Sequence, residues 1–90
     1  MPLTNLEFIR KKLKWRALHR GIKEMDMVVG GFAEAHLGKM SEIQLAQFAE
    51  ILEIPDQDLL AWATRQTPVP TAQKSALLEA MLRFRPQALR

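Results

Sequence analysis

Residues 41–62 read SEIQLAQFAEILEIPDQDLLAW, and they contain the clearest helix boundaries in the chain. Ser41 and Gln44 have the spacing of a capping box, in which the serine oxygen accepts from a first-turn amide and the glutamine side chain reaches back. Pro55 ends this helix because proline cannot continue the backbone hydrogen-bond ladder. The stretch therefore predicts two consecutive helices, the second over about 56–64. The first has an apolar face formed by Leu45, Phe48, Ala49 and Leu52.

The segment before this stretch also has a helical pattern. Apolar residues at 3, 4, 4 spacing indicate a first helix, namely Leu6, Ile9, Leu13 and Ala17. Phe8 and Trp15 fall on its opposite side, so this second apolar side is either covered by a later helix or is a contact surface. A second helix is predicted over about 22–37, and Gly38 is a typical C-terminal stop. Its inner stripe consists of Met25, Val28, Val29 and Phe32.

A last helix follows a stiff PVP connector at 68–70. Thr71 is its predicted N-cap. Its apolar residues are Leu77, Ala80, Met81 and Phe84. Ninety residues with 48% hydrophobic content suit one core. We therefore predict an all-α fold, a compact five-helix bundle that forms a single domain over 1–90, with an ordered core at about 5–84 and a basic C-terminal tail at 85–90.

The charge distribution limits the kinds of partner. Residues 1–23 contain seven Lys/Arg and one acid, 24–63 contain one lysine and eight acids, and 64–90 contain five Lys/Arg and one acid. The net charges of these segments are +6, −7 and +4. An acidic middle would repel phosphates, so the polarity favours a protein partner, and nucleic acid is the less favoured one. The alternative is a small basic helical nucleic-acid-binding or regulatory protein that acts through residues 10–23.

The composition excludes several classes of function. The chain has no cysteine, which rules out disulfides, thiolate metal sites and cysteine nucleophiles. No apolar run approaches the roughly 20 residues of a membrane-spanning helix, and no secretory signal is recognised. We expect no membrane insertion and a cytoplasmic location in a bacterium.

Candidate catalytic residues are few. Gly30 and Gly31 lack the preceding strand and the third glycine of a nucleotide-binding loop, and close approach of two helices explains them better. His36 falls in the last turn of a predicted helix, where an imidazole interacts favourably with the dipole, and no serine, carboxylate or second histidine is placed by local spacing to orient it. His19 is most simply a surface residue. We expect no enzymatic activity, no catalytic residue, no metal site and no firmly bound cofactor.

The stretch RGIKEMD, residues 20–26, joins the first two predicted helices. Gly21 can take a left-handed backbone conformation there and expose bare backbone that a partner approaches closely. Arg20 offers a planar donor fork, and Glu24 lies in the first turn of the next helix. On spacing alone, an ordinary glycine turn with one capping glutamate is the alternative.

These residues resemble a known family, the small helical assembly factors of succinate dehydrogenase, which include bacterial FAD assembly factors. Its hallmark is an RGxxE motif, here Arg20, Gly21 and Glu24, commonly followed by an acid, here Asp26. The resemblance covers about 8–84. It also rests on the segments LKWR with Trp15, SEIQLAQFAEILE, and PDQDLLAW ending in Trp62. The chain departs from the family pattern at Ile22, His19 and Leu60.

The resemblance implies a function. Family members promote covalent attachment of FAD to the flavoprotein subunit of succinate dehydrogenase, so that subunit is the expected partner, and the fumarate reductase flavoprotein is a second candidate. FAD is then the cofactor of the partner, in which a histidine is joined to the flavin, and this chain, expected to be a monomer, need supply only binding energy. The implied partner-binding residues are Arg20, Gly21, Ile22, Glu24, Asp26, Lys12 and Trp15.

Overall fold

The computed structural model describes residues 5–85, which form five α-helices and two short 3-10 turns. The elements are α1 (Asn5–Leu18), α2 (Lys23–His36), η1 (Leu37–Lys39), α3 (Glu42–Ile51), α4 (Asp56–Ala63), η2 (Thr71–Gln73) and α5 (Ala76–Arg83). No strand occurs among these residues, so the predicted all-α fold with five helices is confirmed. Apart from Arg85, the predicted basic tail lies outside the described residues.

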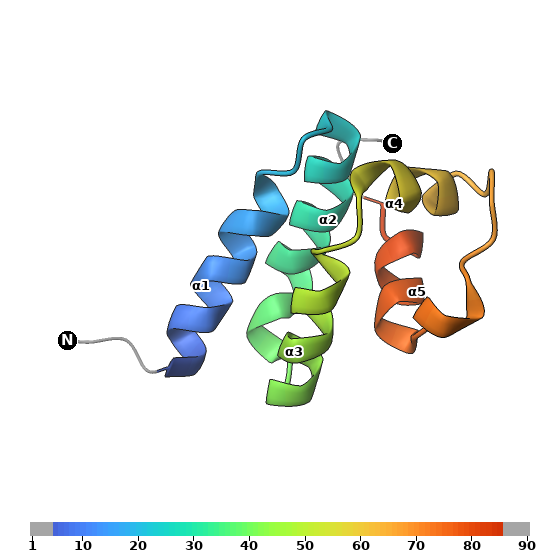
Figure 1. Ribbon diagram of the computed structural model, residues 1–90. Helices are drawn as coiled ribbons and strands as arrows, with labels where there is room; N and C mark the ends of the chain where they lie inside the picture. Colours follow the sequence, from blue (N-terminus) through green and yellow to red (C-terminus); the bar gives the residue numbers. More distant parts are fainter. Residues whose placement is uncertain (1–4, 86–90) are drawn as a thin grey trace.

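Helices α1 and α2 run side by side in opposite directions and are joined by a short turn (Figure 1). Helix α1 also packs against α3, while α5 packs against α2, α3 and α4. Helix α4 crosses the end of the bundle at which the α1–α2 turn lies (Figure 1). The chain order therefore brings the turn between α1 and α2 close to the turn between α3 and α4.

One hydrophobic core joins the helices. Its largest fully buried side chains are Phe48, Met25, Leu59, Leu78, Met81 and Val29. No polar or charged residue among those that the structure describes is buried in it. Each large apolar side chain removed from water contributes about 1.5 to 3 kcal/mol. The core therefore supplies the main driving force for folding.

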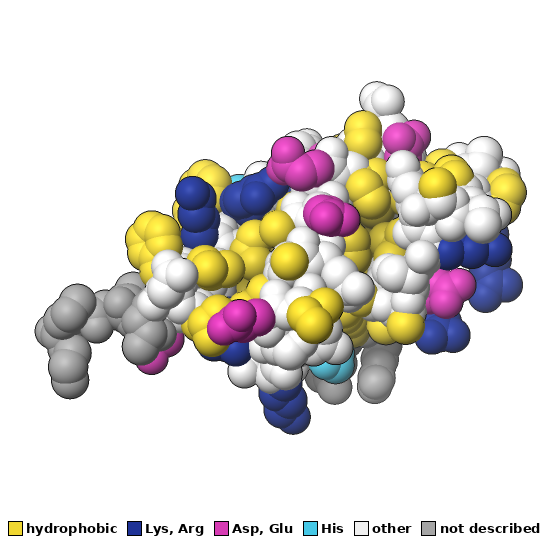
Figure 2. Space-filling view, turned by 60° about the horizontal axis from the view of Figure 1, so that its bottom comes forward, with side chains coloured by type: hydrophobic (Ala, Val, Ile, Leu, Met, Phe, Trp, Pro, Cys, Tyr) yellow, Lys and Arg dark blue, Asp and Glu magenta, His cyan; other side chains and the backbone are white. Residues whose placement is uncertain are grey.

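Helix α1 contributes to this core through the predicted face. Leu13 and Ala17 are buried, and Leu6 packs against the core while partly exposed. The opposite side is not covered by a later helix, because Phe8 and Trp15 are 56% and 63% exposed. Figure 2 shows hydrophobic side chains on the surface at the left, where α1 begins, beside lysine and arginine side chains.

The predicted helix boundaries are correct in most places. The capping box of α3 is present, because the Gln44 amide donates to Ser41 Oγ (3.2 Å) and the Ser41 amide donates to Gln44 Oε1 (3.0 Å). Helix α4 begins directly after Pro55, as predicted. Helix α2 ends at His36, and Gly38 lies in the following turn without a positive φ. Gly38 is thus near the end of the helix but does not act as a left-handed stop.

The prediction that Thr71 caps the last helix is wrong. Thr71 begins the turn η2, and α5 is capped by Ser75, whose Oγ accepts from the Leu78 amide at 3.1 Å. Both residues are of a type that caps helices. Ser75 is the cap because the helix that begins after it buries an apolar face in the core. That face comprises Leu78, Met81 and Leu82.

Gly30 lies where α1 and α2 approach each other closely. A Cβ atom built on Gly30 would lie 2.5 Å from Leu18 Cδ2 and 3.2 Å from Leu18 Cα. Because the second of these atoms belongs to the backbone, a side chain at Gly30 would push the helices apart. The predicted role of this glycine in close helix packing is confirmed.

Candidate functional site

The side chain of Arg20 joins the α1–α2 turn to the α3–α4 turn. Its Nη1 donates to the Leu52 carbonyl and its Nη2 to the Ile54 carbonyl, both at 2.5 Å, and its Nε donates to Asp56 Oδ1 at 2.6 Å. Carbonyls at and beyond a helix C-terminus have no intrahelical donor. The Arg20 guanidinium satisfies two of them after α3, and the Arg20 side chain is only 9% exposed.

Asp56 is the counterpart of Arg20 on the other turn. Its Oδ1 accepts from Arg20, and its Oδ2 accepts from the Gly21 amide at 2.9 Å. Asp56 is the first residue of α4, where the positive end of the helix dipole stabilises a carboxylate. We call Arg20, Asp56 and the carbonyls of Leu52 and Ile54 the Arg20–Asp56 clamp.

The clamp was not predicted from the sequence. Arg20 and Asp56 are 36 residues apart, and each has an ordinary local explanation, as an exposed turn arginine and as a helix-start acid. The only sequence signal was that RGIKEMD and PDQDLLAW both matched the resembled family. The structure explains why the two stretches occur together, since one supplies the donors and the other the acceptors.

Asp26 stabilises the α1–α2 turn by hydrogen bonds to its backbone. Its Oδ1 accepts from the Arg20 amide at 2.5 Å, and its own amide donates to the Ile22 carbonyl at 2.9 Å. Ile22 is the extended N-cap residue of α2, and its side chain packs against the core. Both residues therefore shape the turn, and whether they also contact a partner stays a prediction.

Gly21 does not have the conformation that the sequence suggested. No glycine among residues 5–85 has a positive φ, so Gly21 is not left-handed. The carboxylates of Asp26 and Asp56 hold the amides of the turn, and these bonds make a left-handed residue unnecessary. A Cβ atom on Gly21 would lie 3.4 Å from Asp56 Oδ2, which is an ordinary contact. Neither the backbone nor the internal packing requires a glycine at this exposed position.

Glu24 differs from the other acids of this region. It is exposed in the first turn of α2, and its carboxylate forms no hydrogen bond or ion pair with any residue in the range 5–85. By contrast, Asp26 and Asp56 are used inside the fold. Glu24 is thus available to a partner without breaking an internal contact.

Trp15 and His19 form an aromatic pair beside the turn. Their rings are stacked, with centroids 4.2 Å apart and planes at 15°, and His19 Nδ1 lies 2.7 Å from the Trp15 carbonyl oxygen. Both rings line a shallow hollow of about 370 Å³ together with Arg20, Gly21 and Asp56. The structure therefore brings Trp15 next to the RG turn. Lys12 and Glu24 do not line this hollow.

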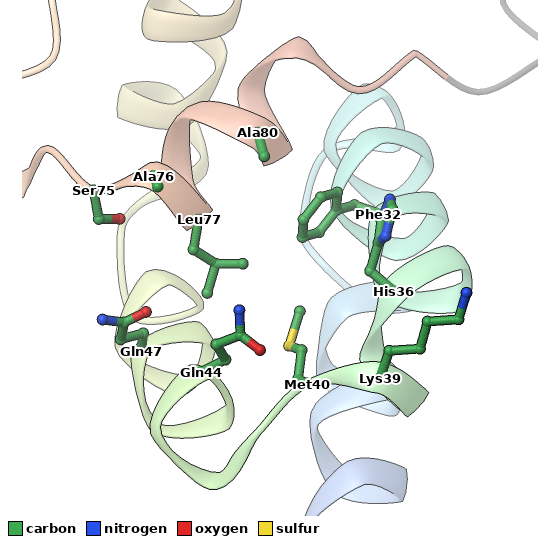
Figure 3. Close-up of a pocket in the computed structure, with 10 residues that line it drawn as sticks. All are labelled: Phe32, His36, Lys39, Met40, Gln44, Gln47, Ser75, Ala76, Leu77 and Ala80. Atoms are coloured by element: carbon green, nitrogen blue, oxygen red, sulfur yellow. The ribbon is translucent and has the colours of Figure 1, made fainter.

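A second hollow of about 450 Å³ lies at the other end of α2 (Figure 3). Phe32, Met40 and Leu77 form its apolar part, while the polar Gln44 and His36 lie at its sides. The His36 ring packs against Phe32, with centroids 4.6 Å apart. None of the predicted partner-binding residues lines this hollow.

The described residues show neither a metal site nor a membrane span. No group of three or more His, Asp or Glu side chains in the range 5–85 is arranged to hold a metal ion. Of the helices formed by these residues, none has both the length and the apolar character needed to cross a membrane.

Comparison with known proteins identifies relatives of the chain. Residues 11–85 match the model of a family described as the flavinator of succinate dehydrogenase. An FAD assembly factor SdhE from Acetobacter pasteurianus is 38% identical over 78 residues, which are 87% of this chain and 72% of that protein. The SdhE protein of Haemophilus ducreyi is 33% identical over 73 residues, 81% of this chain and 88% of that protein.

A mitochondrial relative is similar over a comparable length. The succinate dehydrogenase assembly factor 2 of Dictyostelium discoideum is 31% identical over 77 residues, which are 86% of this chain and 55% of that protein. The chain thus spans about half the length of this mitochondrial relative. With the family model matched over most of the described helices, the chain belongs to the family of flavinators of succinate dehydrogenase.

Proposed function

We propose that this chain binds the flavoprotein subunit of succinate dehydrogenase and promotes covalent attachment of FAD to it, through the turn between α1 and α2. The observation that supports this proposal most directly is the environment of Gly21. Gly21 is exposed, it is not left-handed, and the fold leaves room for a side chain there. Close approach of a partner backbone accounts for a glycine that the chain itself does not need.

The neighbouring residues support this proposal. Glu24 presents an exposed carboxylate that has no partner among residues 5–85, which suits a charge-assisted hydrogen bond to a partner protein. Trp15 offers an apolar surface next to Gly21. Arg20 has a different role in this proposal from the one implied by the resemblance, because its guanidinium is used in the clamp. It fixes the shape of the turn that the partner meets.

The proposed mechanism needs no catalytic group in this chain. The factor would bind preferentially to the arrangement of the FAD-loaded flavoprotein in which the attacking histidine and the flavin are aligned. A binder that favours one arrangement raises its population by its differential affinity. The chain then acts as a monomeric, non-enzymatic factor of the bacterial cytoplasm, and FAD remains the cofactor of the partner.

Gly21→Arg is the main test of the proposed surface. An arginine side chain would cover the turn and block close approach, while the α-helical circular dichroism signal should stay unchanged. Purified flavoprotein subunit is incubated with FAD and each variant, and covalently bound flavin is read by in-gel fluorescence after denaturation. Gly21→Arg should abolish the increase in covalent flavin. Gly21→Ala should leave the fold intact, because a Cβ fits beside Asp56, but should reduce the increase in part, because the added methyl group obstructs close approach of the partner backbone.

Glu24→Ala tests the charged part of the surface. Loss of a hydrogen bond to a charged group costs about 1.5 to 3 kcal/mol, so the dissociation constant for the flavoprotein should rise by at least tenfold. Glu34→Ala is the matched control, because Glu34 is an exposed acid on the same helix. If Glu24→Ala and Glu34→Ala bind equally well, Glu24 is not a contact residue.

A further inference from the structure

An exposed stripe on α1 extends from the turn along the helix. Phe8, Lys12 and Trp15 follow each other at spacings of 4 and 3 residues, which places them on one side of α1, opposite the core residues Leu13 and Ala17. His19 lies just after the end of α1, and its ring stacks on Trp15. We call these four residues the α1 stripe. Phe8 and Trp15 are two of the three large hydrophobic side chains that are exposed within residues 5–85.

The rings of Phe8 and Trp15 are far enough apart to make separate contacts with a partner. At 1.5 Å rise per residue, Phe8 and Trp15 are about 10 Å apart along the helix. Trp15 is stacked on His19, and this contact favours one orientation of the indole ring before any partner arrives. Single exposed apolar side chains are ordinary. Two on one stripe, one of them pre-oriented, are typical of an interface.

The basic residues around the stripe divide into two groups. The arginines point to internal partners: Arg10 donates to the Leu37 and Met40 carbonyls, Arg16 pairs with Glu53, and Arg20 belongs to the clamp. In contrast, three lysines are exposed and form no ion pair within the part of the chain that the structure describes. They are Lys11, Lys12 and Lys14. Among the described residues, the positive charge of α1 that has no internal partner is therefore carried by these lysines.

We propose that the α1 stripe and its lysines bind an acidic segment of the flavoprotein partner that carries apolar side chains. This inference rests on the proposed function and names the chemistry of the partner segment. Phe8 and Trp15 would contact apolar side chains of the partner segment, and the surrounding lysines would attract its carboxylates. Hydrophobic side chains and Lys/Arg side chains lie together at this end of the surface (Figure 2).

The stripe is continuous with the surface of the turn. Trp15 and His19 line the same hollow as Gly21. A partner segment that meets Gly21 at close range would therefore continue along α1 towards Phe8. The interface would extend over one side of α1 instead of ending at the RG turn.

Two other occupants fit these features less well. Nucleic acid is best recognised by arginine forks on phosphates and base edges, and the arginines here are committed internally. A second copy of this chain would have to offer the acids of residues 24–63, and three of these, Asp26, Glu53 and Asp56, already form hydrogen bonds or an ion pair within the fold.

The test compares stripe variants with matched surface controls. Binding to the purified flavoprotein subunit is measured for Phe8→Ala and for Lys11→Glu combined with Lys12→Glu. The controls are Ile43→Ala, which removes an apolar side chain that is 73% exposed on α3, and Lys39→Glu in η1. All four changes are on the surface, and their thermal unfolding is recorded alongside.

Phe8→Ala should raise the dissociation constant at least fivefold. The double lysine variant should raise it at least tenfold at low salt, and this difference should shrink as salt is added, because exposed charges are screened. Both controls should stay within about twofold of the unmodified chain.

Three results would overturn this inference. The first is unchanged binding by both stripe variants while Glu24→Ala weakens it, which would leave the proposed function intact. The second is steeply salt-dependent binding of the unmodified chain to a DNA or RNA duplex that is lost in the double lysine variant. The third is concentration-dependent self-association that the same variant abolishes. Absence of any complex with the unmodified chain would instead refute the proposed function itself.

Discussion

Replacing Asp56 by alanine should destabilise the fold markedly, although Asp56 is not in the core. The substitution removes the charge-assisted bond to Arg20 Nε and the bond to the Gly21 amide. It also leaves the Arg20 guanidinium, whose side chain is 9% exposed, without its counter-charge. Removing one member of a buried ion pair costs about 3 to 5 kcal/mol.

The lower end of that range applies here. The Asp56 side chain is 17% exposed, so water partly compensates, and Arg20 keeps two carbonyl acceptors. A loss of about 3 kcal/mol is a large share of the 5 to 15 kcal/mol typical of small domains. At about 4 to 8 °C per kcal/mol for a chain of this size, the melting temperature should fall by roughly 15 °C.

The assay is thermal and urea unfolding followed by far-ultraviolet circular dichroism. Asp58→Ala is the matched control, because Asp58 lies in the same first turn of α4 but is exposed. It should change the free energy of unfolding by no more than about 0.5 kcal/mol. The reasoning is refuted if Asp56→Ala is as mild as Asp58→Ala. A double-mutant cycle with Arg20→Ala should give a coupling of at least about 1 kcal/mol.

Two further predictions concern glycine packing and helix capping. Gly30→Ala should lower the free energy of unfolding by about 1 kcal/mol, because its clash with Leu18 outweighs the roughly 1 kcal/mol gain in helix propensity. Gly38→Ala should be within about 0.5 kcal/mol of neutral, since nothing lies near its added Cβ. Ser75→Ala should cost about 1 kcal/mol through loss of the α5 cap, whereas Thr71→Ala should cost less than half of that. Urea unfolding measures all four, and a larger effect at Thr71 than at Ser75 would contradict the capping assignment.

The sequence by itself determined the helices and most of their boundaries. Helical periodicity, the Ser41–Gln44 capping box and the break at Pro55 act over four residues or fewer, so their outcome does not depend on the rest of the chain. The two apolar sides of α1 were visible for the same reason. The RGxxE and PDQDLLAW stretches were recognised as separate motifs.

Only the tertiary structure decided how those motifs are used. Arg20 and Asp56 meet across 36 residues because α2, α4 and α5 pack on one core and bring two helix turns together, which no local spacing encodes. The same packing selected Ser75 over Thr71 as the cap of α5. It also gave the turn two carboxylate acceptors, so that Gly21 needs no left-handed backbone. Local patterns fix where helices form, whereas long-range packing fixes which polar groups find partners and which, like Glu24, remain exposed.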